Sequence, residues 1–217
     1  MYRWDFCRSV MSAQLLVALG EERGVSRQQL LHNSGISEEQ LYNPETVVEA
    51  QSELTIVRNL IRALPNNPEL ALHAGQRYQL STYGIWGFAI ASSPNARQAI
   101  ELARNFQELT FVFAPFNISM DREKTTIAFD DEGIPQDVQR FCLERDMAAA
   151  AVILGELLGQ PDAVEQIRFR HGPPPYLEEY RRAFPGKLHF NAGSNLFEIS
   201  NTVLDVPRVM GNASTAN

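Results

Sequence analysis

Apolar residues recur at helical spacing through the first eighty positions of the chain. In the segment 9–22 the spacing places Val10, Ala13 and Leu16 on one face, as expected for an amphipathic helix. The segment 46–64 has the same periodicity, with apolar residues at Val47, Leu54, Val57, Leu60, Ile61 and Leu64. Shorter helices are predicted between these two segments and over residues 69–78. We therefore expect residues 1–80 to form a helical region.

Beyond residue 80 the pattern changes to short strands interleaved with helices. Residues 111–119 and 124–130 are predicted to form a β-hairpin around the polar turn Asp121-Arg122-Glu123. Further strands are predicted over 164–170, 187–191 and 195–200, and helices over 96–109, 136–158 and 176–183. This order favours an α+β fold, in which a helical N-terminal region packs with a small antiparallel or mixed sheet covered by helices. We assign residues 81–206 to this α+β region and residues 207–217 to a tail or linker.

The charge balance argues against direct binding to polyanions. The chain of 217 residues has 19 basic and 26 acidic side chains and a net charge of -7, whereas affinity for duplex DNA comes mainly from Lys and Arg. The same balance disfavours an anionic membrane surface. Two cysteines, Cys7 and Cys142, are too few for a disulfide framework. With no signal peptide and an apolar run of only eight residues at 147–154, we expect a cytoplasmic protein.

Residues 26–41 resemble a helix-turn-helix in their spacing, with Gly35 between two short predicted helices. The second of these helices carries Glu38 and Glu39 and has no Lys or Arg. Two carboxylates would face the phosphates of a DNA duplex and be repelled. Packing between helices is therefore the favoured interpretation of this segment.

Sequence signals of catalysis are absent. The chain contains no Gly-x-Ser-x-Gly, Gly-x-Gly-x-x-Gly, phosphate-binding Gly-Lys-Ser/Thr or His-Glu-x-x-His motif. The four histidines are scattered, at His32, His73, His171 and His189, and no metal-ligand spacing is recognisable. We expect no catalytic residues, no bound metal and no cofactor, and hence no enzymatic activity.

One charged residue lies within an apolar stripe of the longest predicted helix. At helical spacing Phe141, Cys142, Ala149 and Val152 share a face with Arg145 in its middle, and charges are rarely buried unless they are paired. An internal ion pair is the favoured interpretation. The alternative is that the planar guanidinium of Arg145 binds the carboxylate of an anionic effector.

Aromatic residues gather on both sides of the predicted helix 96–109. Such residues are typical of a hydrophobic core, the favoured interpretation for any one of them, and they are also typical of a ligand pocket. Together with Arg145, we take five of them as candidate ligand-binding residues: Tyr83, Trp86, Phe88, Phe113 and Phe116.

Four stretches of the chain resemble the N-terminal domain of AraC/XylS-type transcription regulators. They lie in the same order and spacing as in the subgroup with an "arabinose-binding" N-terminal domain, which includes an ornithine-responsive regulator. The stretches are HNSGISEEQL at 32–41, YGIWGFAIASSP at 83–94, FRHGPPPYLEEYRRAFPGKLHF at 169–190 and LFEISNTVLDVP at 196–207. The ending Asp205-Val206-Pro207-Arg208 departs from the Leu-Pro-Leu-Pro-like ending usual in the family.

The resemblance implies a domain that senses a small effector, such as an amino acid or another carboxylate, and biases an attached DNA-binding module. It also implies a homodimer, and contact with DNA only through helix-turn-helix units that follow this region in the family and are missing here. Such a switch requires an effector that binds two states with different affinity. The alternatives are a haem- or gas-sensing domain, with His73 as axial ligand, and a small-molecule hydrolase or lyase using carboxylates.

Overall fold

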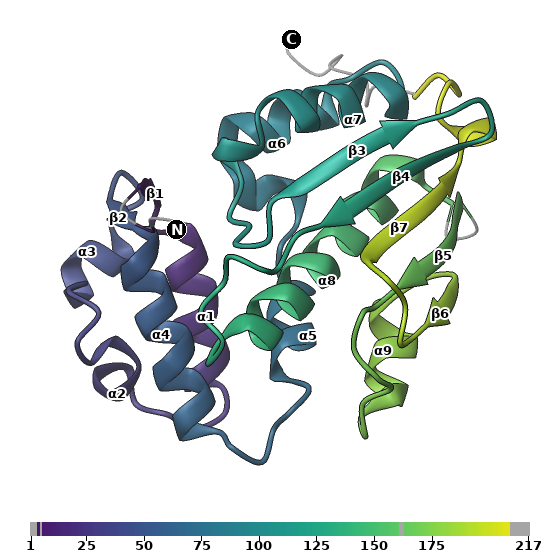
Figure 1. Ribbon diagram of the computed structural model, residues 1–217. Coiled ribbons are helices and arrows are strands. Elements are labelled where there is room, and N and C mark those ends of the chain that lie inside the picture. Colours follow the sequence, from purple (N-terminus) through teal and green to yellow (C-terminus); the bar gives the residue numbers. More distant parts are fainter. Residues whose placement is uncertain (1–3, 5, 161–162, 209–217) are drawn as a thin grey trace, which may run out of the picture.

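The computed structural model describes residues 4, 6–160 and 163–208. Its N-terminal part is mainly helical, as predicted, and lies on the left of Figure 1. The elements there are β1 Cys7–Ser9, α1 Met11–Glu21, α2 Arg27–Leu31, α3 Glu38–Tyr42, β2 Val47–Glu49, α4 Ala50–Ala63 and α5 Leu70–Gly75. Ser26 and Ser37 accept hydrogen bonds from the first turns of α2 and α3, which fixes where these short helices begin.

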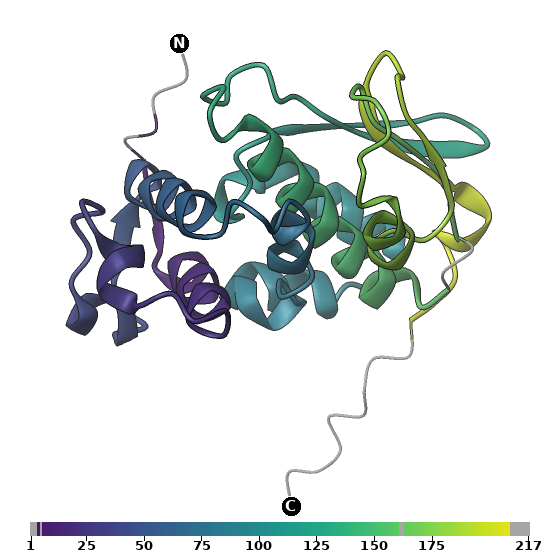
Figure 2. The same ribbon diagram turned by 90° about the horizontal axis from the view of Figure 1, so that it is seen from below.

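The remainder of the chain alternates helices and strands. Its elements are the 3-10 turn η1 Leu80–Tyr83, α6 Gly84–Ala91, α7 Ala96–Asn105, η2 Gln107–Leu109, β3 Phe116–Met120, β4 Lys124–Phe129, α8 Gln139–Leu158, β5 Val164–Arg168, α9 Leu177–Ala183, β6 Lys187–His189, β7 Asn195–Ser200 and η4 Asn201–Val203. Figure 2 shows the helices gathered on one side of the sheet. The α+β fold predicted from the sequence is therefore confirmed.

The five-stranded sheet has the order β3-β4-β7-β5-β6 and is mixed. Its pairs are antiparallel except β5 and β6, which run parallel. In the register of β3, β4 and β7, Ile118, Ile127 and Phe197 lie side by side on one face. Side chains alternate between faces along a strand, so this face is apolar and packs toward the helices. On the opposite face Glu198 lies between Lys124 and Arg168, at 3.5 and 3.4 Å.

Two local predictions were wrong in ways that have a physical cause, and one segment without a predicted element is helical. The helix expected from residue 46 begins at Ala50, because Val47–Glu49 pairs with Cys7–Ser9 as a two-stranded ribbon. The strand expected from residue 111 begins at Phe116, because the backbone at Phe113 and Ala114 is bonded to a buried carboxylate. The glycine-spaced segment 83–90 is mostly helix. The domain boundary at residue 80 stays a prediction, and most of the predicted tail lies outside the described residues.

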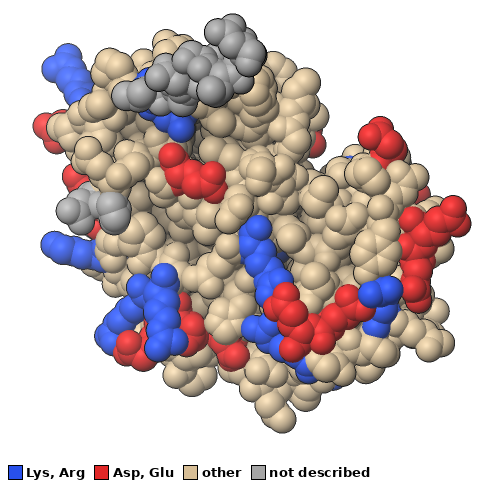
Figure 3. Space-filling model, turned by 180° about the vertical axis from the view of Figure 1, so that it is seen from behind, with Lys and Arg blue, Asp and Glu red and all other residues tan. Residues whose placement is uncertain are grey.

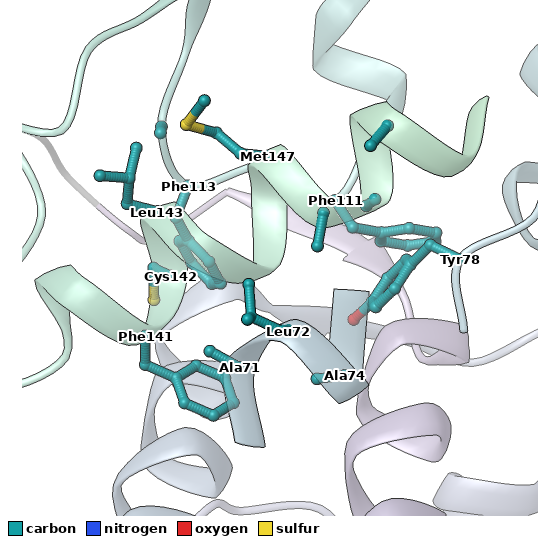
Figure 4. Close-up of a cluster of buried hydrophobic side chains, with 14 of the residues drawn as sticks. Ala71, Leu72, Ala74, Tyr78, Phe111, Phe113, Phe141, Cys142, Leu143 and Met147 are labelled. Carbon is teal, nitrogen blue, oxygen red and sulfur yellow. The ribbon is translucent and has the colours of Figure 1, made fainter. Parts of the chain in front are cut away.

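Helices α5 and α8 are packed closely at the centre of the molecule, where the helical part meets the sheet part (Figure 1). Figure 4 shows Ala71 and Leu72 of α5 below α8, on the side of Cys142, whereas Met147 projects from the opposite side of α8. The approach depends on Gly75, since a Cβ atom there would lie 2.5 Å from the Cβ of Ala148 and would overlap the carbonyl oxygen of Arg145. The contact leaves no room for a side chain.

We expect Gly75→Ala to destabilise the fold by about 1–3 kcal/mol, because an added methyl group forces the backbones of α5 and α8 apart. The matched control is Gly155→Ala, on the exposed side of α8, where an added Cβ meets nothing within 4 Å. That change should stabilise the helix by about 0.5–1 kcal/mol. Urea unfolding of both variants measures the difference, and equal stabilities would contradict the close contact.

Candidate functional site

An apolar cavity, partly open to the surface, lies between the sheet and helices α6, α7 and α8. Its volume is about 70 Å³, room for a few water molecules or a very small organic group. The lining residues come from all of these elements and from the segment before β3: Tyr83, Trp86, Ile90, Ala99, Ile100, Ala103, Thr110, Val112, Phe116, Ile118, Ile127, Phe129, Asp146, Ala150, Ile153, Leu154 and Leu157. Apolar pockets with a few polar groups are the usual form of small-molecule sites.

Two glycines shape the helix that forms one wall of the cavity. Gly84 begins α6 with a φ of 54°, a left-handed conformation that favours glycine. Gly87 lies so close to the carbonyl group of Leu80 that a Cβ atom would overlap it. This approach packs α6 onto η1 and turns Trp86 and Ile90, one helical turn apart, toward the cavity.

The six candidate residues from the sequence fall into three groups. Tyr83, Trp86 and Phe116 line the cavity, and the Tyr83 and Trp86 rings are 5.0 Å apart. Phe88 is 73% exposed on the outer side of α6. Phe113 and Arg145 are buried outside the cavity wall, in contact with each other. Binding of a ligand by any of these residues stays a prediction.

Most of the cavity wall was not anticipated from the sequence. The cavity is also lined by Ile100 on α7, Ile127 on β4 and Leu154 on α8. In the sequence these residues have the pattern of ordinary core positions. The sequence did indicate part of the wall, because the apolar stripe of α8 and the alternation in β3 and β4 identify the sides of these elements that face the interior. These signals do not reveal where the core leaves a space.

Next to the cavity, Arg145 is the centre of a buried ion cluster. Its Nη1 atom lies 2.6 Å from Oε1 of Glu53, and its Nη2 atom lies 2.6 Å from Oδ1 of Asp146. Nη2 also donates to the carbonyl oxygen of Phe111 at 2.7 Å. All three side chains are at most 2% exposed. The internal ion pair that the sequence favoured for Arg145 is therefore present.

The cluster is completed by groups from distant parts of the chain. Arg8 lies 3.5 Å from Oε2 of Glu53 and donates to the Phe111 carbonyl oxygen at 2.8 Å. The Ser12 hydroxyl lies between Glu53 and the hydroxyl of Tyr78, at 2.7 and 2.6 Å. Burial lowers the pKa of Arg145, but the charges of Asp146 and its other neighbours outweigh burial and hold that pKa well above its ordinary value. Arg145 is a fixed cation.

Asp146 belongs to both the ion cluster and the cavity wall. Its Oδ2 atom accepts hydrogen bonds from the backbone N–H groups of Phe113 and Ala114, at 2.6 and 2.8 Å. Its Oδ1 atom is paired with Arg145. One carboxylate therefore fixes the segment before β3 and joins the cavity to strand β1 and helix α4, which carry Arg8 and Glu53.

A second polar cluster is centred on Glu144, beneath helix α9. The Glu144 carboxylate pairs with Arg140 and accepts hydrogen bonds from Tyr176 and Tyr180, at 2.9 and 2.5 Å. Burial raises the pKa of Glu144, against the opposing effect of Arg140. His171 lies 3.2 Å from the Tyr180 hydroxyl, and burial lowers the pKa of His171 to about 4. This cluster joins α8 to α9 and is separate from the cavity.

The surface has no basic stripe on the face drawn in Figure 3, where basic and acidic side chains are intermixed. No helix among the described residues is long and apolar enough to cross a membrane. The part of the chain that the structure describes also contains no cluster of three or more His, Cys, Asp or Glu side chains able to hold a metal ion.

Comparison with known proteins identifies the class of this fold and cavity. Residues 24–208 match the family described as the arabinose-binding domain of AraC transcription regulators, N-terminal. The chain belongs to this family, and it is a regulatory N-terminal domain of an AraC-type transcription regulator. The resemblance stated from sequence stretches is thus confirmed.

Individual relatives agree with this assignment. The chain is 25% identical over 206 residues to the ornithine utilization regulator of Pseudomonas aeruginosa, covering 95% of this chain and 60% of the relative. It is 30% identical over 139 residues to an uncharacterized HTH-type transcriptional regulator of Mycobacterium tuberculosis, covering 64% of this chain and 40% of the relative. The chain thus corresponds to only part of these proteins.

The fold also matches a solved structure. The crystal structure of transcriptional regulator CdpR from Pseudomonas aeruginosa superimposes with a TM-score of 0.66 at 18% sequence identity. The match covers 93% of this chain and 58% of that one. At this identity the comparison supports the arrangement of helices and strands alone.

Replacement of Arg145 should unfold or strongly destabilise the protein. We expect Arg145→Met to cost about 3–5 kcal/mol, because both buried carboxylates would lose their nearest cation. Glu53 would keep only Arg8 at 3.5 Å and the Ser12 hydroxyl, and Asp146 only two backbone N–H donors. The control is Arg58→Met, which removes a solvent-exposed pair with Asp137 and should cost about 0–1 kcal/mol. Guanidinium unfolding compares the two. Equal costs would show that the cluster contributes no more than a surface pair.

The half-buried His171 predicts a pH dependence of stability. Because its pKa is lowered from 6.5 to about 4 in the folded state, the folded protein binds fewer protons than the unfolded chain between these values. The stabilisation from neutral His171 is full above about pH 6.5 and is lost as the pH falls toward 4. Urea midpoints from pH 7.5 to 4 should fall less steeply for His171→Gln than for the wild type, and parallel curves would contradict the assignment.

Proposed function

We propose that this chain is the effector-sensing domain of its regulator, and that a small metabolite binds in the cavity between α6, α7, α8 and the sheet. The observation that carries the proposal is the cavity itself, which is bordered by three helices and two strands of the family domain. A well-packed interior leaves few spaces larger than a water molecule. A space bordered by aromatic rings and one carboxylate is therefore a natural effector site.

The ion cluster supports a route by which occupancy of the cavity reaches the rest of the domain. Asp146 borders the cavity, and its partner Arg145 is bonded to Glu53 on α4. A ligand that moves α8 or the segment at 110–114 changes the geometry of this pairing. An effector shifts a regulator only by binding its two states with different affinity, and a buried charge cluster makes intermediate arrangements unfavourable.

DNA recognition is assigned to a module outside this chain. The net charge of -7 and the mixed charges in Figure 3 give the domain little attraction for phosphates. The relatives are longer, and one is named an HTH-type regulator. We propose that effector binding here biases such a DNA-binding module, that the regulator acts as a homodimer, and that it works in the cytoplasm without catalysing a reaction.

The haem-binding alternative has little support in the surroundings of His73. Nδ1 of His73 lies 2.8 Å from Nη2 of Arg23, and its Nε2 lies 3.2 Å from Oε2 of Glu179. Both ring nitrogens thus face protein groups. Nothing in the cavity or in the Glu144 cluster favours the hydrolase or lyase alternative by a nucleophile next to a base.

Filling the cavity should abolish the response to an effector. The change Ala150→Leu places a larger side chain at the cavity wall. In a thermal-shift screen of amino acids, small carboxylates, fatty acids and neutral organic molecules, a ligand at about a hundred times its Kd should raise the Tm of the wild type by about 5–10 °C. Ala150→Leu should lose that shift.

The matched control is Ala18→Leu on helix α1, at a half-buried position remote from the cavity lining. This variant should keep the ligand-induced shift. A ligand that stabilises Ala150→Leu as well as the wild type would bind elsewhere, and a screen without any stabilising compound would count against the sensing role.

A further inference from the structure

The charged groups around the cavity are already paired. Among the described residues that line it, Asp146 is the only one with a charged side chain, and both of its carboxylate oxygens are engaged by Arg145 and two backbone N–H groups. The Thr110 hydroxyl donates to the carbonyl oxygen of Gln107 at 2.6 Å. A zwitterion placed here would lose its hydration without gaining a counter-charge, which is strongly unfavourable.

Among the described residues of the wall, one fully buried side-chain polar atom has no hydrogen-bond partner. The indole N–H of Trp86 is buried and has no hydrogen-bond acceptor among the residues that the structure describes. The side chain is 5% exposed and belongs to the cavity wall. Buried donors are nearly always satisfied in folded proteins, so an unsatisfied donor at a cavity points to an acceptor that arrives with a ligand.

The small interior volume of the cavity favours a small molecule. Its volume is about 70 Å³, whereas a cavity of about 150 Å³ admits a benzene-sized compound. A short chain or a single ring therefore fits only with a modest outward movement of the wall. Such a movement is the kind of change that a sensing domain needs in order to respond to its ligand.

We propose that the cavity binds an uncharged, mainly hydrocarbon molecule with a single acceptor oxygen, of the ketone, ester or lactone class, and that this oxygen accepts the hydrogen bond of Trp86 Nε1. The inference rests on the proposed effector-sensing function. It replaces the amino acid or other carboxylate expected from the family resemblance, because the described residues of the wall offer such a ligand no free cation. Hydrocarbon groups of the ligand pack against the apolar remainder of the lining.

The test compares two molecules of nearly the same shape, cyclohexanone and methylenecyclohexane, which differ in the acceptor oxygen. The chain has two tryptophans, so Trp4→Phe leaves Trp86 as the sole indole signal in a spectrum of ¹⁵N-labelled protein. Cyclohexanone should move the indole proton of Trp86 downfield, and the alkene should not. The ketone should bind about tenfold more tightly, the factor given by one net hydrogen bond.

The change Trp86→Phe keeps an aromatic ring and removes the donor. It should weaken ketone binding about tenfold and leave alkene binding unchanged. The spectrum of the Trp4→Phe protein keeps the inference testable even where Trp86→Phe fails to fold. Leucine and ornithine serve as zwitterionic probes and should cause no Tm shift.

The outcomes separate this inference from the proposed function. Equal binding of ketone and alkene, both lost in Ala150→Leu, would overturn the acceptor class and leave the cavity as the effector site. Binding of leucine or ornithine that is lost in Ala150→Leu would overturn the uncharged class in the same way. Failure of neutral, anionic and zwitterionic compounds alike to stabilise the protein would overturn the sensing function, and this inference with it.

Discussion

A guanidinium with no access to water constrains much of this structure. Arg145 can be charged in the interior only if anionic and carbonyl oxygens surround it, and these come from Glu53, Asp146 and Phe111. The three lie on α4, on α8 and in the segment before β3. The cluster therefore holds the helical region against the α+β region. The ion pair of Arg145 with Glu53 joins residues on the two sides of the predicted boundary at residue 80.

The cavity and the ion cluster depend on each other. By accepting two backbone hydrogen bonds, Asp146 fixes the course of the chain just before β3, and this course brings Thr110 and Val112 to the cavity wall. The opposite wall is set by α6, whose position depends on the glycine contact with Leu80. The space between them thus depends on two backbone contacts, one on each side of the cavity.

The sequence predicted the long helices and most strands well, because their apolar periods are regular over many residues. It failed where tertiary contacts override the local pattern. The alternation of Phe111 and Phe113 is typical of a strand. In the structure, however, the Phe111 carbonyl accepts from Arg145 and the Phe113 N–H donates to Asp146. Gly84 and Gly87 have low helical propensity, so the sequence does not indicate helix α6. The helix forms because the close contact of Gly87 with Leu80 of η1 compensates for that propensity. Because helix α6 was not predicted, the sequence could not show that Phe88 lies on its solvent-exposed side. Phe88 was therefore taken as a ligand-binding candidate together with Trp86.

For the site, the sequence brought forward Tyr83, Trp86 and Phe116, which do meet at one cavity. Arg145 was singled out correctly as a charge in an apolar stripe. Its partners could not be named, because the most distant of them, Ser12, lies 133 positions away along the chain. No periodicity encodes pairings of this kind, and the space left inside a core depends on all side chains at once.

The position of Arg8 determines where a stable fragment of this domain can begin. The family match begins at residue 24, yet Arg8 and Ser12 contact Glu53 in the middle of the molecule. A fragment that begins at residue 24 would lack helix α1. It would also lack the Arg8 guanidinium and the Ser12 hydroxyl that contact the buried carboxylate of Glu53. The smallest autonomous folding unit thus extends upstream of the segment by which the family is recognised.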